Sequence, residues 1–282
     1  MSALLTWSLV AASIASATSL LGGEAARTKS APAVTQGGAA VTAAGNQVSS
    51  GTFQLVGRGA QGTVVLLRLG QEGRAVLVTA AHVLEAMRGE TAFLRLHQTS
   101  RDGLAGRQSE PIRIRYGGCP LWTRHPSADI AILELTTFPS LWRRLPAVDL
   151  LASRSVLASQ AQGRSVHVAG FPSDAKAGAD GLPVLRTGAL TTPVFPSANW
   201  FTVSVSVCPG LSGAPVYAAV PGLSGGDVLL GIVSLAMVRT DELESPAHLA
   251  VAVPAPLIAE TIRRLPALSA GRRLARHPDG LD

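Results

Sequence analysis

The sequence predicts an all-β fold of the sandwich or barrel type. Short apolar runs recur along the chain with Gly, Pro, Asn, Asp and Ser between them, a pattern typical of strands joined by turns. Hardly any stretch has the apolar spacing of a long helix. An apolar content of 47% and a charged content of 15% allow a substantial core and argue against disorder through the middle of the chain.

The apolar runs fall into two sets of expected strands. The first set lies near residues 52–57, 62–69, 74–79, 91–97, 111–115 and 130–135. The second set lies near residues 165–169, 184–190, 200–207, 214–219, 228–236 and 248–253. Two short helices are expected beside them. One runs from Val83 to Met87, and the other follows Pro254, where apolar residues recur at helical spacing (Leu257, Ile258, Ile262, Leu265).

The charge distribution gives little support to nucleic-acid binding. The chain has 24 basic and 18 acidic residues, and the basic ones are scattered without interleaved aromatic side chains. The exception is a basic tail, residues 266–282, which we expect to be solvated. The six histidines and two cysteines lack the spacing of metal ligands, so neither a metal nor another cofactor is predicted.

The N-terminal region predicts export. Residues 1–21 contain an apolar stretch and the small-residue pattern Ala15-Ser16-Ala17, as a cleaved signal does, although no Lys or Arg precedes the stretch. The alternative is a weakly apolar, disordered start. Residues 22–51 are rich in small residues and predict a flexible leader. No other stretch has the roughly 18 apolar residues of a membrane span, so we expect a secreted or periplasmic protein without a stable membrane span after signal removal.

The two cysteines, Cys119 and Cys208, leave two alternatives open. In an exported chain they could form a disulfide, since Cys119 precedes Asp129 by ten residues and Cys208 precedes Ser212 by four, and Asp129 and Ser212 are candidate residues of one site. The other alternative is a pair of buried free thiols.

The segment from Cys208 to Pro215 contains a candidate nucleophile. Ser212 stands between glycines, directly after one expected strand and before the next, so its hydroxyl can be exposed on a turn. The glycines also let the N–H groups of Gly210 and Ser212 point to one spot, where an oxyanion would be stabilised. Taken alone, the segment is equally well explained as an ordinary Gly/Ser turn.

Two upstream segments supply the partners that a serine nucleophile needs. His82 lies in Thr79-Ala-Ala-His and Asp129 opens the apolar run Asp-Ile-Ala-Ile-Leu. A histidine can take the serine proton, and a carboxylate can fix the histidine tautomer and stabilise the imidazolium. The chain order of His, Asp and Ser differs from that of α/β-hydrolases and subtilisins. These residues are therefore our candidate catalytic triad.

Together these motifs resemble the chymotrypsin-like (trypsin-fold) serine peptidases, closest to compact bacterial trypsin-like and HtrA-type peptidase domains. Val168-Ala-Gly-Phe-Pro, Gly231-Ile-Val-Ser and Val251-Ala-Val-Pro are similar to further family segments. The resemblance covers residues 52–265. It implies two six-stranded antiparallel β-barrels packed around an active-site cleft, with a short C-terminal helix. The implied parts are an N-terminal barrel (52–138), a linker (139–164), a C-terminal barrel (165–254) and a helix (255–265).

The resemblance also implies where substrate binds. Backbone groups of Ser234 would pair with the substrate chain, and the specificity pocket would be lined by Ser206, Val207, Leu235 and Ala236. Ser206 offers no counter-charge for a basic substrate side chain. Glu-specific family members tend to have a histidine at the position of Val233, so we expect a small or medium apolar side chain in the pocket. Acidic residues of the following loop could reach it (Asp241, Glu242, Glu244).

Three positions depart from the animal digestive enzymes of this family. Leu211 replaces an aspartate that pairs with a new N-terminus after activation, so that route of activation is not expected. Ala214 and Ala236 replace glycines. A second serine, Ser224, lies in the similar segment Gly-Leu-Ser-Gly-Gly, but too few residues separate it from Gly231, and we interpret it as part of a hairpin loop.

These features predict a serine endopeptidase that cleaves proteins or peptides through an acyl-enzyme. The sequence does not indicate its oligomeric state or natural substrate. The alternative is a catalytically silent trypsin-fold domain that binds peptides or proteins. A structural β-protein in which the three residues coincide by chance is the remaining hypothesis.

Overall fold

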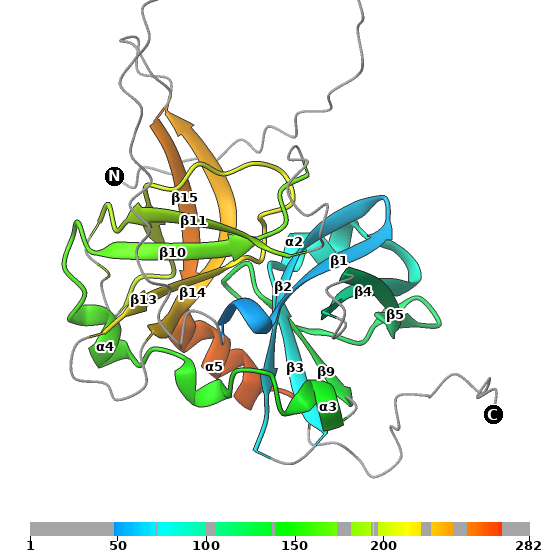
Figure 1. Cartoon of the computed structure of the whole chain (residues 1–282). Helices are drawn as coiled ribbons and strands as arrows, with labels where there is room; N and C mark the ends of the chain where they lie inside the picture. Colours follow the sequence, from blue (N-terminus) through cyan, green and yellow to red (C-terminus); the bar gives the residue numbers. More distant parts are fainter. Residues whose placement is uncertain are drawn as a thin grey trace, which may run out of the picture. The chain divides into compact units, whose positions relative to one another are not determined.

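The computed structural model of the chain describes residues 48–70, 73–99, 105–136, 139–173, 182–192, 194, 197–220, 227–239 and 247–266. All of them belong to one unit, Ala40–Asp282. Within this unit the main elements are two antiparallel sheets, which confirms the all-β prediction (Figure 1).

The first sheet has seven strands in the order β5-β4-β1-β2-β3-β9-β8. Every neighbouring pair is antiparallel. The strands are β1 (Thr52–Arg58), β2 (Ala60–Arg68), β3 (Arg74–Thr79), β4 (Arg88–Thr99), β5 (Ala105–Arg113), β8 (Thr123–Arg124) and β9 (Ala131–Thr136). The short pair β6 (Arg115–Tyr116) and β7 (Cys119–Pro120) forms a separate hairpin.

The second sheet has six strands in the order β11-β10-β13-β14-β15-β12. They are β10 (Ser165–Gly170), β11 (Val184–Ala189), β12 (Phe201–Val203), β13 (Pro215–Ala219), β14 (Asp227–Arg239) and β15 (Ala247–Pro254). A bridge between Leu190 and Val203 joins its two edges. The Ser204 N–H also donates to the Ala189 carbonyl at 2.8 Å, so this sheet closes on itself.

The helices are short. Besides the helical residues 48–50, they are α2 (Ala81–Ala86), α3 (Pro139–Trp142), η1 (Val148–Leu150), α4 (Arg154–Ala158) and α5 (Ala255–Arg263). The sequence predicted α2 and α5 but not the three helical turns in the connection between the sheets. In α4 the Ser153 hydroxyl accepts from the Val156 N–H at 3.2 Å, which is a helix N-cap.

The continuous apolar runs of β2, β3 and β9 are explained by burial on both faces. In β2, Val64 and Leu66 face the core of the first sheet, whereas Val65 and Leu67 face a different cluster. That second cluster also contains Leu229 and apolar residues of β14, β15 and α5 (Ile232, Val253, Leu257, Ile258). It therefore joins the first sheet to the second sheet and to α5.

Three sequence predictions for strands needed correction. The strand expected near 111–115 is β5, Ala105–Arg113, which pairs with β4 over its whole length. The first sheet has seven strands because Thr123–Arg124 adds to β9 through two residue pairs. The strand expected at 200–207 ends at Val203, since the Ser204 side chain replaces a ladder partner by accepting from the Ala189 N–H at 3.0 Å.

The structure has free thiols, and not a disulfide, at the two cysteines. No disulfide joins Cys119 and Cys208. Cys119 is exposed, against the expectation of burial, and the Cys208 sulfur is 3.5 Å from Arg186 Nη2.

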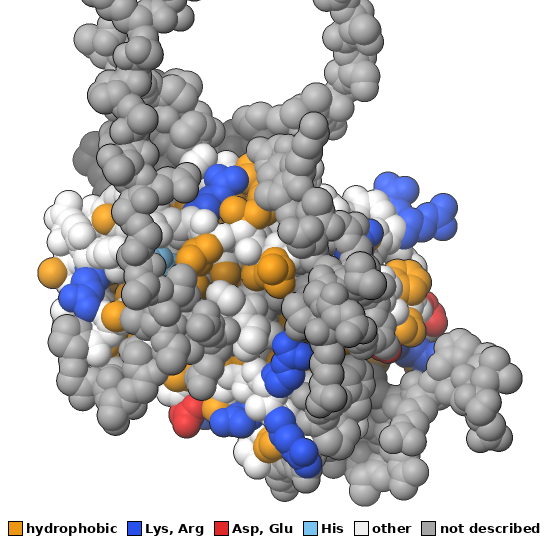
Figure 2. Space-filling model, viewed as in Figure 1, with side chains coloured by type: hydrophobic (Ala, Val, Ile, Leu, Met, Phe, Trp, Pro, Cys, Tyr) orange, Lys and Arg blue, Asp and Glu red, His pale blue; other side chains and the backbone are white. Residues whose placement is uncertain are grey.

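Several sequence predictions lie outside the described residues. These are the signal region, nearly all of the leader, Ser224, the acidic loop residues and all but the first residue of the basic tail. Within the described ranges, no helix has the length and apolar character needed to cross a membrane. On the face drawn in Figure 2, Arg side chains stand at separate places.

Candidate active site

His82 is held at the start of α2, directly after β3. The Val83 N–H donates to the Ala80 carbonyl at 3.1 Å, and the neighbouring side chains of Ala81, Val83 and Leu84 are buried. The His82 side chain is 46% exposed. The buried apolar side chains thus fix the short helix in place, and the His82 imidazole stays accessible to solvent.

Arg115 satisfies the open carbonyls at the end of α2. Its guanidinium donates to the carbonyls of Leu84, Met87 and Gly89 at 2.9, 2.6 and 3.1 Å. It also stacks over the Trp122 ring, 4.7 Å from the centroid. Because a six-residue helix leaves most of its terminal carbonyls without helical partners, these contacts stabilise the helix that carries His82.

Asp129 lies at the centre of a tight turn before β9. The Ile130 N–H donates to the Ala128 carbonyl at 2.9 Å, and the His125 N–H donates to the Ile130 carbonyl at 3.0 Å. Ala128 and Ile130 are both buried in the cluster between the sheets. The carboxylate is therefore on a rigid turn whose flanking side chains cannot move independently of the core.

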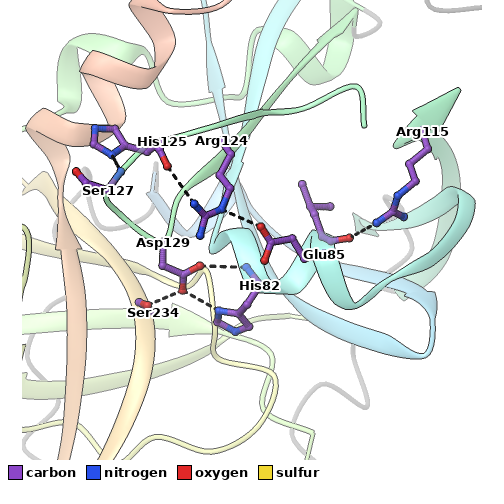
Figure 3. Close-up of polar contacts among 9 residues, drawn as sticks. His82, Glu85, Arg115, Arg124, His125, Ser127, Asp129 and Ser234 are labelled. Atoms are coloured by element: carbon purple, nitrogen blue, oxygen red, sulfur yellow. Dashed lines mark hydrogen bonds and ion pairs between the residues drawn. The ribbon is translucent and has the colours of Figure 1, made fainter. Parts of the chain in front are cut away.

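The structure brings His82 and Asp129 together. His82 Nδ1 is 2.7 Å from Asp129 Oδ2, and the His82 backbone N–H donates to Oδ1 at 3.0 Å (Figure 3). An ionised carboxylate can only accept hydrogen bonds, so the ring proton lies on Nδ1. In a neutral imidazole this leaves Nε2 able to accept a proton.

Ser234 is a third contact of the carboxylate, and the sequence did not predict this role for its side chain. Its hydroxyl donates to Asp129 Oδ2 at 2.6 Å. The pairing of β14 with β15 shifts register between Val233 and Leu235, so Ser234 is the unpaired residue of a bulge. A bulge re-aims a side chain out of the strand's normal alternation, which explains how Ser234 reaches Asp129.

These contacts set the ionisation of Asp129. Burial raises the pKa of its carboxyl, but the hydrogen bonds from His82 and Ser234 and the charge of His82 outweigh burial, so the pKa lies below its usual value. The carboxylate is therefore negative at neutral pH and can stabilise an imidazolium at His82.

Two successive tight turns build the loop that carries Ser212. The Leu211 N–H donates to the Cys208 carbonyl at 3.2 Å, and the Ala214 N–H donates to the Leu211 carbonyl at 2.9 Å. Gly210 and Gly213 occupy the third position of the two turns, with φ of 94° and 86°. Type II turns require a positive φ at this position, which is why the sequence has glycine there. Leu211 is fully buried, so the loop is anchored by packing.

Ser212 reaches the same neighbourhood but does not complete a chain with His82. Within the described residues, the one hydrogen bond of its Oγ is to the Ser234 carbonyl, at 3.5 Å, and none joins it to His82. Ser234 thus touches both halves of the site, through its carbonyl to Ser212 and through its hydroxyl to Asp129.

The backbone around Ser212 has two N–H groups without an acceptor in the described part of the chain, those of Gly210 and Ser212. The Pro209 carbonyl accepts from the N–H and hydroxyl of Ser173 at 2.8 and 2.9 Å. Since C=O and N–H of one peptide point in opposite directions, the Gly210 N–H points away from Ser173. Both free donors are available to a ligand oxygen.

Thr63 in β2 fixes this loop from the other sheet, a role that nothing in the sequence indicated. Its N–H donates to the Ser212 carbonyl at 2.9 Å and its hydroxyl donates to the Gly210 carbonyl at 2.7 Å. The same hydroxyl accepts from the Phe171 N–H at 3.0 Å. Contacts between residues so far apart in the chain have no local sequence signal.

The predicted pocket residues lie on the two segments that flank Ser212. Ser206 is exposed and Val207 half-buried, in the stretch before the nucleophile loop. Leu235 and Ala236 belong to β14, where their backbones pair with Val251 and Ala250, and their side chains lie outside what the structure describes. Near this stretch the structure adds Arg186, which donates to the Ser206 carbonyl.

No metal-type cluster accompanies the site within the described residues. No group of three or more His, Cys, Asp or Glu side chains there is arranged to hold an ion.

Among the solved structures to which the chain is similar are three structures of two proteins. One is the HtrA-type protease AlgW with tripeptide, at 16% identity and a TM-score of 0.49, with 79% of this chain and 62% of that chain covered. Another is an inactive serine-to-alanine mutant of Rv3671c from M. tuberculosis H37Rv, at 16% identity, a TM-score of 0.47 and coverage of 77% and 87%. The third structure is the Rv3671c protease in its inactive form, at 17% identity and a TM-score of 0.46, with 78% of this chain and 91% of that chain covered.

Sequence comparisons found no such likeness. No family model matches the chain, and no curated protein matches it. AlgW and Rv3671c are both proteases.

Proposed function

We propose that the protein is a serine endopeptidase. The observation that carries the proposal is the 2.7 Å contact between His82 Nδ1 and Asp129 Oδ2, with the Ser212 loop joined to the same carboxylate through Ser234. Export of the protein, inferred from residues 1–21, remains part of the proposal.

In the proposed reaction His82 Nε2 takes the Ser212 hydroxyl proton while Ser212 Oγ bonds to the carbonyl carbon of a peptide. The carbonyl electron pair moves to oxygen, which accepts from the N–H groups of Gly210 and Ser212. When the carbonyl re-forms, the C–N bond breaks and His82 gives its proton to the leaving amine. Water then attacks the ester in the same way, which releases the acid and returns the proton to Ser212.

This chemistry requires one change from the present geometry. The Ser212 hydroxyl must leave the Ser234 carbonyl and meet His82 Nε2. The present contact, at 3.5 Å, is longer than the roughly 2.5–3.0 Å of an ordinary O–H···O hydrogen bond and is easily given up. Catalytic hydrogen bonds are often long before substrate binds.

Labelling with a fluorophosphonate probe tests the proposal. We expect the probe to label Ser212 in the wild type, and neither Ser212→Ala nor His82→Ala to be labelled. Peptide cleavage should fall by about 10⁴–10⁶-fold in each variant. Ser204→Ala, which changes an exposed serine of the same region, should label as the wild type does. Folded wild-type protein that resists several such probes would exclude the proposal.

The second candidate function is a catalytically silent domain that binds peptides. The observation in its favour is that Ser212 Oγ contacts the Ser234 carbonyl and not His82. It predicts saturable peptide binding with no cleavage product by mass spectrometry and no effect of Ser212→Ala on the affinity.

A further inference from the structure

Arg186 places a positive charge beside the predicted specificity pocket. Arg186 lies on β11, which pairs with β10 (Figure 1). It is directly opposite Val168, so both side chains are on the same face of the sheet. Val168 is fully buried in the core of the second sheet. The Arg186 side chain therefore leaves β11 on the face of the second sheet that is turned to the core.

The guanidinium ends at the segment before the nucleophile. Nη1 donates to the Ser206 carbonyl at 2.6 Å, and Nη2 is 3.5 Å from the Cys208 sulfur. Cys208 is itself the first residue of the turn that ends at Leu211, next to Ser212. The ends of such a turn are less than about 7 Å apart. The positive charge is thus close enough to be reached by a substrate side chain held at Ser212.

Within the described part of the chain, no acidic side chain neutralises the charge of Arg186. Among the described residues, no Asp or Glu forms an ion pair with Arg186, although the side chain is half-buried. A guanidinium stays protonated at any physiological pH and has more N–H donors than the two contacts use. The remaining donors can bind a carboxylate in the forked geometry that arginine favours.

We infer that Arg186 makes this pocket select an acidic side chain, Glu or Asp, on the acyl side of the cleaved bond. This inference rests on the proposed peptidase function and specifies its substrate class. It replaces the small or medium apolar side chain expected from Ser206, Val207 and Val233 alone. The signal for it in the sequence is an arginine at an inward position of a strand, because such a side chain needs a polar partner.

The test compares cleavage of matched peptides that differ only in the residue before the cut: Glu, Asp, Gln, Leu and Lys. We expect kcat/KM for Glu to exceed that for Gln, its neutral isostere, by about 30-fold or more, as when one partner of a hydrogen-bonded charge pair is removed. Arg186→Gln should abolish the difference, and Arg186→Lys should keep part of it.

Arg164→Gln is the matched control. Arg164 lies directly before β10, is also half-buried and also donates to a backbone carbonyl, that of Ala219. Among the described residues it has no hydrogen bond to the Ser212 loop. Its loss removes the same charge and should leave the Glu preference unchanged. Thermal unfolding of each variant shows whether the fold survives.

A binding experiment keeps this inference separate from the proposed catalysis. In Ser212→Ala, product-like peptides that end in Glu or Gln are titrated with Arg186 present and with Arg186→Gln. Tighter binding of the Glu peptide that depends on Arg186 supports the acidic pocket even if no peptide is ever cleaved. Equal binding of the two peptides, or cleavage that prefers Leu or Gln over Glu, would overturn it.

Discussion

At the scale of single residues, Asp129 joins three directed contacts in the site. Three donors meet its two oxygens: the His82 ring, the His82 N–H and the Ser234 hydroxyl. Each contact favours the ionised form more than the protonated form. The same contacts therefore orient the imidazole and connect the stability of the fold to the charge of one carboxylate.

The lowered pKa of Asp129 predicts a specific pH dependence of stability. Its unfolded value is about 3.9 and its folded value is lower, so the stabilisation is complete above about pH 4 and is lost as the pH falls through the folded pKa. Urea unfolding from pH 7 to pH 2.5 should show wild type losing stability in this acidic range.

Asp129→Asn should be less stable at pH 7 and should lose less on acidification, since its amide does not titrate. Asp149→Asn, in the short helix η1, is a control and should retain the wild-type acid dependence. Parallel curves for wild type and Asp129→Asn would show that this carboxylate does not contribute.

At the scale of elements, the nucleophile loop is determined by its two glycines. Gly213 has a φ of 86°, and a Cβ there would overlap the Thr63 carbonyl and the Thr79 hydroxyl. An alanine must therefore accept both an unfavourable backbone conformation and a displaced neighbour.

We expect Gly213→Ala to lower the free energy of unfolding by about 2–4 kcal/mol, from conformational strain and overpacking together. Gly163 is a matched control, because its φ is 82° and no atom lies within 4 Å of the position that an alanine Cβ would take. Gly163→Ala should cost only the conformational part, about 1–2 kcal/mol. Chemical denaturation measures both, and equal losses would contradict the packing argument.

At the scale of the whole unit, the site depends on how the two sheets are joined. The apolar cluster shared by β2, β3, β9, β14, β15 and α5 aligns them, and Thr63 links β2 to the Ser212 loop through its N–H and hydroxyl. His82 and Asp129 lie on segments next to β3 and β9 of the first sheet. Ser212 lies directly before β13 and Ser234 within β14, both strands of the second sheet.

Thr63→Val should lower both stability and peptidase activity. It leaves the Gly210 carbonyl and the Phe171 N–H without their buried partner, which costs about 1–3 kcal/mol, and it frees the loop that holds Ser212. Thr261→Val is the control: it loses an equally buried hydroxyl, bonded at 2.7 Å to Leu257 within α5. It should lose comparable stability but keep kcat/KM once folded.

Much of the fold could be predicted because strand periodicity is local information. The strand at Arg74–Thr79 matches its predicted bounds, and β10, β13 and β15 differ from theirs by a residue or so at either end. The short strand Thr123–Arg124 was missed because two residues give no periodic pattern and exist only through pairing with β9.

Of the candidate site, the sequence could predict the three main residues but not the contacts that hold them. The motifs around His82, Asp129 and Ser212 identified candidates because their neighbours are constrained by turns and buried strands. The contacts of Thr63, Ser173 and the Ser234 hydroxyl could not be predicted, since each joins segments that only folding brings together.

The sequence by itself determined the strands, the turns with obligatory glycine and the residues able to perform proton transfer, because these depend on near neighbours along the chain. Only the tertiary structure decided that Ser234 serves Asp129, that Thr63 and Ser173 hold the Ser212 loop, and that Arg186 reaches Ser206. Such contacts depend on sheet closure and on the packing of one sheet against the other, which are properties of the whole core.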